Sequence, residues 1–164
     1  MENDILQALY TRYYSAALLY TTSLCGDGFL VEDIVSEAFV KACISLPGEI
    51  PSFQFWLLRV CKNLWIDHLR RQPAHITDEQ LLTLTDHQTP ESKYLTDQRY
   101  RCLWQGIRAL PPIDREIVTL HYFSRLPLQD VARLVGKGYP AVRQRLSRLR
   151  QVLKKHMEVH GYDF

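Results

Sequence analysis

The chain has little of what marks a membrane-bound or exported protein. No apolar run in its 164 residues approaches the roughly 18 needed to cross a bilayer. The first four residues include two acids, Glu2 and Asp4, and no basic segment of the kind that begins a secretory signal. These absences predict no membrane insertion of its own and a cytoplasmic location.

Cysteine is scarce and dispersed. The four cysteines are Cys25, Cys43, Cys61 and Cys102, and no two of them form a C-x-x-C motif. Three of these, all but Cys102, fall in apolar helical patterns, which favours buried free thiols over disulfides or a metal centre. His156 and His160 lie four residues apart and would share one side of a helix, but the sequence places no third ligand nearby. We therefore predict no metal site and no cofactor.

Motifs of the common enzyme classes are missing as well. The sequence contains no glycine-rich phosphate loop, no nucleophile elbow and no metalloprotease helix. Its many carboxylates are scattered over the polar faces of predicted helices. We therefore predict that the protein is not an enzyme, and we assign no catalytic residue.

Helical periodicity dominates the chain, and no convincing alternating strand pattern is present. The pattern predicts helices over about 3–24, 29–46 and 53–71, with Ser52 as an N-cap for the third. Residues 72–98 are polar and rich in acids and carry Pro73 and Pro90, as expected of an interdomain linker. Further helices are predicted from about 91 or 94 to 110 and over 112–123. The expected fold is all-α, with two small helical domains (1–72 and 94–158) joined by a flexible acidic linker (73–93).

The segment from Leu126 to Arg150 has the pattern of a helix-turn-helix, whose second helix enters the DNA major groove. Gly136 is suited to the left-handed backbone that ends the first helix, and Pro140 to the first turn of the second. We therefore expect the second helix to start near Tyr139. Two apolar stripes would pack the helices together, one of Val131, Leu134 and Val135 and the other of Val142, Leu146, Leu149 and Leu153.

Charge is distributed unevenly. Residues 125–155 hold nine lysines and arginines against one acid, Asp130, a balance of +8 in a chain whose net charge is +2. A solvated helix face usually mixes both signs, whereas this segment does not. The imbalance therefore predicts binding to a polyanion, and DNA is the polymer that a helix-turn-helix binds.

The predicted third helix, 53–71, carries cations on the side opposite its apolar stripe. Arg59, Lys62, Asn63 and Arg70 fall there, interleaved with Phe55 and Ile66. Cations that neutralise phosphates beside rings that receive bases suit single-stranded nucleic acid. Equally, the large side chains Phe55, Trp65 and Leu69 would pack against the other two helices. Periodicity alone does not decide between these two interpretations.

Several motifs in order resemble the bacterial sigma-70-type sigma factors, specifically the small extracytoplasmic-function (ECF) group. Residues 31–42 (VEDIVSEAFVKA) look like the family's conserved region 2.2, and residues 53–71 look like regions 2.3 and 2.4 with the Asn63, Asp67 and Arg70 spacing. Leu110-Pro111, Glu116 and Tyr122-Phe123 resemble region 4.1, and residues 126–150 resemble region 4.2. In contrast to the family pattern, Lys137 follows the turn glycine in place of an apolar residue.

The resemblance implies roles for particular positions. Polymerase docking would use Glu32, Asp33, Val35, Glu37, Phe39 and Lys41. Recognition and opening of the minus-ten element would use Arg59, Lys62, Asn63, Asp67, Arg70 and Arg71, and the 47–52 loop would help to capture an unstacked base. The minus-thirty-five element would be read by Lys137, Tyr139, Ala141, Arg143, Gln144, Arg145, Ser147 and Arg148. Ala141, Arg143, Gln144 and Ser147 would reach base edges, while Lys137, Arg145, Arg148 and Arg150 would hold phosphates.

The implied function is promoter-specific transcription initiation. Its implied partners are core RNA polymerase, through the beta-prime clamp helices and the beta flap, promoter DNA in duplex and melted form, and an anti-sigma factor. Two alternatives remain open at this point. One is a polymerase-independent helix-turn-helix regulator, and the other is a protein-interaction module that keeps the fold.

Overall fold

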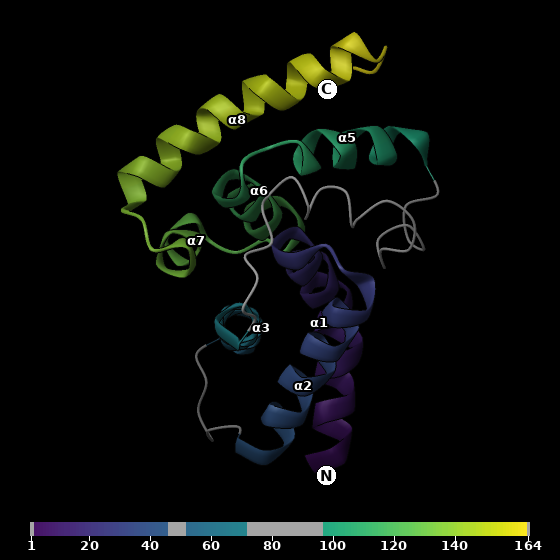
Figure 1. Ribbon diagram of the computed structural model, residues 1–164, viewed down its shortest axis with the longest axis vertical. Helices are drawn as coiled ribbons and strands as arrows, with labels where there is room; N and C mark the ends of the chain where they lie inside the picture. The colour runs from purple at the N-terminus through teal and green to yellow at the C-terminus, as the bar shows by residue number, and fades with distance from the viewer. Residues whose placement is uncertain (1, 46–51, 72–96, 164) are drawn as a thin grey trace.

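The computed structural model describes residues 2–45, 52–71 and 97–163, and helices account for nearly all of them (Figure 1). In chain order they are α1 (Glu2–Cys25), α2 (Gly28–Ser45), α3 (Phe53–Arg71), α5 (Gln98–Arg108), α6 (Pro112–Val118), the π-helical turn η2 (Thr119–Phe123), α7 (Leu128–Val135) and α8 (Tyr139–Val159). No strand occurs within the described ranges. This confirms the predicted all-α fold.

The first three helices form a bundle in which each packs against the other two. Asp27 begins α2 by accepting hydrogen bonds from the backbone N–H groups of Phe29 (3.1 Å) and Leu30 (3.4 Å). Ser52 begins α3 in the same way, through a 3.2 Å hydrogen bond from Phe55 N–H, as predicted. Aromatic rings from all three helices cluster at one end of this bundle, namely Tyr10, Tyr13, Tyr14, Phe39, Phe53 and Trp56.

The second half of the chain, residues 97–163, is organised around α8, which contacts α5, α6 and α7 (Figure 1). Pro112 opens α6, where its missing N–H costs nothing. The predicted helix 112–123 is not uniform, because its last five residues form the wider turn η2. Arg125 follows with a left-handed φ of 55°, which turns the chain towards α7. This turn could not be predicted from the sequence, because arginine is not a residue that favours a positive φ.

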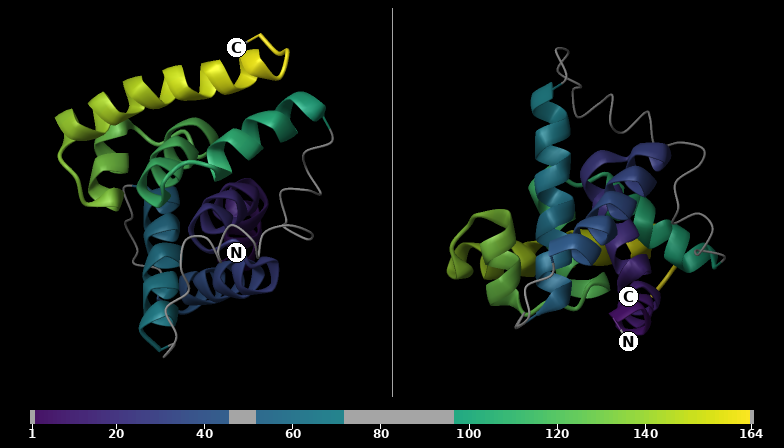
Figure 2. Two further views of the ribbon diagram at one scale, coloured as in Figure 1. Left: turned by 45° about the horizontal axis from the view of Figure 1, so that its top comes forward. Right: turned by 90° about the horizontal axis from the view of Figure 1, so that it is seen from below.

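The two halves also pack against each other, with α1 lying against α6 and η2 (Figure 2). Their buried apolar side chains form a single core, from Ala17 and Tyr20 in α1 to Ile117 and Leu120 in the second half. The linker predicted for 73–93 lies outside the described residues. The sequence predicted two domains but did not predict this shared core.

The bounds of the helices follow the sequence closely. The third helix has both of its predicted ends, Phe53 and Arg71. α1 and α2 differ from prediction by one residue at each described end. α5 ends at Arg108, close to prediction, but starts at Gln98 and not at the predicted 91 or 94. Asp97 caps this start, and its carboxylate accepts a 2.9 Å hydrogen bond from Arg99 N–H. None of the helices in the described part is long and apolar enough to cross a membrane.

Candidate nucleic-acid interface

The helix-turn-helix is built by α7, a glycine-containing turn and α8. Gly136 ends α7 with φ 72°, in the left-handed region where glycine has no side chain to clash. Its N–H and that of Lys137 both donate to the carbonyl of Ala132, at 3.0 and 3.2 Å. Gly138 is the N-cap of α8, and Pro140 lies in the first turn. The turn glycine, the start near Tyr139 and the position of the proline are all confirmed.

The face of α8 that points away from α7 is exposed and basic. Lys137, Tyr139, Arg143, Gln144, Ser147 and Arg148 are all exposed, as is Ala141. A shallow hollow at the start of the helix is lined by Tyr139, Pro140, Ala141, Arg143, Gln144 and Ser147. Most of the side chains predicted to read the minus-thirty-five element therefore lie together on one accessible surface.

Arg145 is the exception on this helix. Its Nη1 lies 2.9 Å from Asp114 Oδ1 of α6, and the side chains are only 33% and 14% exposed. A charge-assisted hydrogen bond of this kind holds α8 to α6. In this structure the guanidinium of Arg145 is thus paired with Asp114, and its contact with a DNA phosphate stays a prediction.

On α3, the predicted minus-ten residues separate into two groups. Arg59, Asn63, Asp67, Arg70 and Arg71 are exposed. Lys62 is half-buried, with its ammonium 2.9 Å from Glu116 Oε1 and donating to the backbone carbonyl of Leu134. The prediction of an outward, solvent-facing Lys62 is therefore corrected, because this cation is used to contact the second half of the chain.

Glu116 is buried and contacts polar groups of two helices of the first half of the chain, α1 and α3. Besides Lys62, it accepts a 2.6 Å hydrogen bond from the hydroxyl of Tyr20, which is fully buried in α1. Burial, and then the negative charge of Glu116, raise the pKa of Tyr20 well above its ordinary value. A buried carboxylate needs such partners to offset the loss of its hydration.

A cleft separates α3 from α7 and is lined by Phe55, Arg59, Lys62, Asn63, Arg133 and Leu134. At its edge the Arg133 guanidinium stacks 4.9 Å from the centre of the Phe55 ring. Beside it, Gln54 Nε2 donates to the carbonyl of Ser124 at 2.6 Å. The basic face of α3 and the helix-turn-helix therefore meet in this structure.

The large side chains of α3 differ in how deeply they are buried. Trp65 is buried and stacks on His68, so it belongs to the bundle. Leu69 is exposed, and Phe55 and Ile66 are half-buried at the outer face. The packing interpretation therefore holds for Trp65 and in part for Phe55, which packs against the core, and base binding at the outer face stays a prediction.

Comparison with known proteins places these features in one family. The family model described as Sigma-70 region 2 matches residues 9–74, and the model described as Sigma-70, region 4 matches residues 100–153. The chain belongs to the sigma-70 family. Its relatives include the ECF RNA polymerase sigma factor BldN of Streptomyces coelicolor, 27% identical over 150 residues, which cover 87% of this chain and 56% of BldN. The ECF RNA polymerase sigma factor SigW of Bacillus subtilis is 27% identical, with 82% of this chain and 79% of SigW covered.

Solved structures show the same fold. The sigma factor RpoE of Bartonella quintana, in complex with the anti-sigma factor NepR, matches 93% of this chain and 96% of its own with a TM-score of 0.67 and 18% identity. CnrH, in complex with the cytosolic domain of CnrY, matches 96% of this chain and 90% of its own with a TM-score of 0.62 and 20% identity.

For this sigma factor, the surface predicted to contact polymerase needs one correction. Glu32, Asp33, Glu37 and Lys41 are exposed on α2, but Val35 and Phe39 are 0% and 8% exposed and belong to the core. In their place α2 exposes Phe29, Val40 and Ile44, with Phe29 77% and Ile44 79% exposed. Sequence reasoning missed these three, although their spacing from Asp33 and Glu37 already put them on the acidic face of the helix.

A possible group of metal ligands, of which the sequence analysis found only the two histidines, lies at the C-terminal end of α8. His156 and His160 are brought against Cys102 of α5, the third ligand type that the sequence analysis did not find near them. The signal was present only in three dimensions, because the cysteine precedes His156 by 54 residues.

Proposed function

We propose that this sigma factor binds core RNA polymerase and directs it to promoters through two DNA-contacting surfaces, without catalysing a reaction itself. The observation that carries the proposal is the exposed, single-sign face of α8 in a chain that also contains a region 2 bundle. A regulator that works without polymerase would need only the helix-turn-helix. Domain bounds of 1–72 and 94–158, with a linker over 73–93, remain part of this proposal.

The minus-thirty-five element is the proposed ligand of α8. Arg143, Gln144 and Ser147 line the hollow at its start, and their donors and acceptors suit base edges in the major groove. Lys137 and Arg148 flank them as exposed cations and would hold phosphates. Arg145 would act indirectly, because its bond to Asp114 fixes the angle at which α8 leaves α6.

The minus-ten element is the proposed ligand of α3. Arg59 and Asn63 lie beside Phe55, which offers a ring to an unstacked base. These groups line the cleft against α7, so a DNA strand that reaches them must displace Arg133 from the Phe55 ring and Lys62 from Glu116. We therefore infer that α3 and α7 separate when the promoter is bound.

Polymerase is the proposed partner of the exposed face of α2. Phe29, Asp33, Glu37, Val40 and Ile44 recur at helical spacing, with acids between apolar ends. Large exposed apolar side chains on one face are typical of an interaction surface, and the acids would pair with a basic partner. An anti-sigma factor is a second proposed partner, by analogy with the complexes of RpoE and CnrH.

In vitro transcription with purified core RNA polymerase tests the proposal. The wild-type chain should support initiation at a defined start site, and the Arg143→Glu/Arg148→Glu variant should not, since it reverses two charges on the DNA face. Lys154→Glu is the matched control, because it changes charge at an exposed position of the same helix, about 9 Å beyond Arg148 along its axis. Duplex binding by the wild-type protein without any promoter-specific transcript would instead indicate the polymerase-independent regulator.

A further inference from the structure

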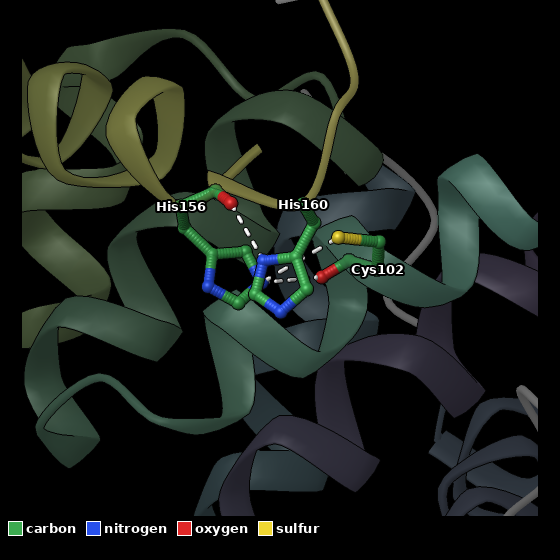
Figure 3. A group of neighbouring side chains, drawn as sticks. All are labelled: Cys102, His156 and His160. Atoms are coloured by element: carbon green, nitrogen blue, oxygen red, sulfur yellow. Dashed lines mark hydrogen bonds between the residues drawn. The ribbon is translucent and has the colours of Figure 1, made fainter. Parts of the chain in front are cut away.

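Cys102, His156 and His160 form a compact group on the side of the second half remote from the recognition end of α8 (Figure 3). Cys102 comes from α5, His156 from the last turns of α8, and His160 is the residue that caps α8. One potential ligand atom from each lies within 4.8 Å of the other two. His156 and His160 lie beyond the region 4 match, which ends at residue 153, and none of the three residues belongs to the proposed DNA-binding surfaces.

The spacing of the first two ligands fits a tetrahedral zinc ion. Cys102 Sγ and His156 Nε2 are 3.7 Å apart. Zinc bonds of about 2.3 Å to sulfur and about 2.05 Å to nitrogen, at a tetrahedral angle, place those two atoms about 3.6 Å apart. The present separation of these two atoms therefore matches that of two ligands of a tetrahedral zinc ion.

The imidazole of His160 has one nitrogen available for the same ion. Its Nδ1 donates to the carbonyl of His156 at 2.8 Å, which leaves Nε2 as the unprotonated nitrogen. Histidine ligands of metals are commonly fixed by such a hydrogen bond to a backbone carbonyl. His160 is exposed, so the ion would reach the site from solvent on this side.

The position of His156 depends on a glycine in the facing helix. The ring packs against Gly106, one helical turn after Cys102, and a Cβ added there would lie only 2.7 Å from His156 Cδ2. The absence of a side chain at 106 therefore allows the ring to reach the cysteine. In the metal-free structure, Nε2 lies 2.9 Å from the Cys102 carbonyl, to which it donates its proton.

We propose that these three side chains bind a divalent ion of the thiolate- and imidazole-preferring class, Zn²⁺, with water as the fourth ligand. Binding shifts the His156 proton from Nε2 to Nδ1 and releases the Cys102 thiol proton to solvent, so each ion displaces one proton. The bound ion joins α5 to the end of α8. The remaining water position and the exposed side make this a site that exchanges its ion with the surroundings.

Cobalt titration of the purified, chelator-treated full chain tests the proposal. Co²⁺ should bind one ion per chain and produce the sulfur-to-cobalt charge-transfer absorption and the intense visible bands of a tetrahedral thiolate site. One equivalent of Zn²⁺ should abolish them and raise the melting temperature. Cys102→Ser and His156→Asn should lose these bands, whereas Cys43→Ser and His68→Asn, which change the same residue types elsewhere, should retain them.

Gly106→Ala separates metal binding from mere packing, because it keeps all three ligands and displaces the His156 ring. Its zinc dissociation constant should rise at least about tenfold, while its far-ultraviolet circular dichroism stays that of the wild type. Absence of thiolate–cobalt bands in the wild type, or bands of equal strength in Cys102→Ser, would overturn the site. In that case the His156 ring serves only to hydrogen-bond the Cys102 carbonyl.

Discussion

Lys62 of α3 and Glu116 of α6 form an ion pair of 2.9 Å across the boundary between the two halves of the chain. Their side chains are only 21% and 9% exposed, so water screens the pair weakly. One partner lies on the surface proposed to bind the minus-ten element, and the other in the domain proposed to bind the minus-thirty-five element. The same contact thus bears on stability and on access to DNA.

Glu116→Gln should destabilise the protein. The amide keeps an oxygen that accepts from Tyr20 but cannot neutralise Lys62, and the loss of a charge-assisted, largely buried bond costs about 2 kcal/mol. Urea unfolding of the two proteins measures the difference in free energy. Glu158→Gln, at an exposed position of α8, is the control and should unfold like the wild type.

The same variant should bind single-stranded minus-ten DNA more tightly than the wild type. Releasing Lys62 from Glu116 gives α3 an additional cation and makes separation from α7 easier. Fluorescence anisotropy with a labelled oligonucleotide measures this, together with Glu116→Gln/Lys62→Met, which should lose the gain. Equal affinity of Glu116→Gln and wild type would show that the contact with α6 does not limit access to α3.

Arg145 and Arg148 should differ in what they affect, although they are close neighbours on α8. Arg145→Met removes the bond to Asp114 and should lower the free energy of unfolding by about 1 kcal/mol. Arg148→Met should leave stability unchanged and reduce the slope of log affinity against log salt concentration by about 0.9, the value for one lost phosphate contact. Urea unfolding and salt-dependent duplex binding, measured on both variants, provide the comparison.

Phe29→Ser and Ile44→Ser should weaken binding to core polymerase without loss of stability. Both side chains are more than three quarters exposed, so the fold gains little from them, whereas burying each in an interface would contribute roughly 1.5 kcal/mol, or about tenfold in affinity. Titration of labelled sigma factor with core polymerase gives the dissociation constants. Ile5→Ser, at an exposed apolar position of α1, is the matched control. Unchanged affinity in both variants would place the docking surface elsewhere.

Stability should fall in mildly alkaline solution because of Cys61. Burial raises the pKa of this thiol from 9.0 to about 12. A folded-state pKa above the unfolded value stabilises the protein fully below about pH 9, and this contribution is lost as the pH rises towards 12. Urea unfolding between pH 8 and 10 should show a loss approaching 1.4 kcal/mol per unit above pH 9. The loss should be smaller in Cys61→Ala, and an equal slope in both proteins would contradict the prediction.

Local features of the fold were accessible from the sequence because short-range rules determine them. The ends of α3 follow from Ser52 and the apolar period, and the turn before α8 follows from Gly136. The exposed basic face of α8 follows from the same period, since Val142, Leu146 and Leu149 fix which side is buried.

The contacts between distant segments were not accessible in this way. Nothing in the neighbourhood of Glu116 indicates that its partners are Tyr20 and Lys62, and helical periodicity carries no record of which helices meet. The contact of Cys102 with His156 and the packing of the His156 ring against Gly106 could not be predicted for the same reason. Val35 and Phe39 were assigned to the surface by family position, although the apolar period of α2 places them inward.

The continuity of α8 gives its two ends a mechanical relationship. Its 21 residues extend about 32 Å, with the side chains proposed to contact DNA near one end and His156 near the other. Leu153 and Met157 are buried and pack the C-terminal half of this helix against the rest of the protein. A change of tilt where α5 contacts the helix would therefore displace its proposed DNA-binding end, so we expect substitutions near Cys102 and His156 to alter promoter selection without touching a nucleotide.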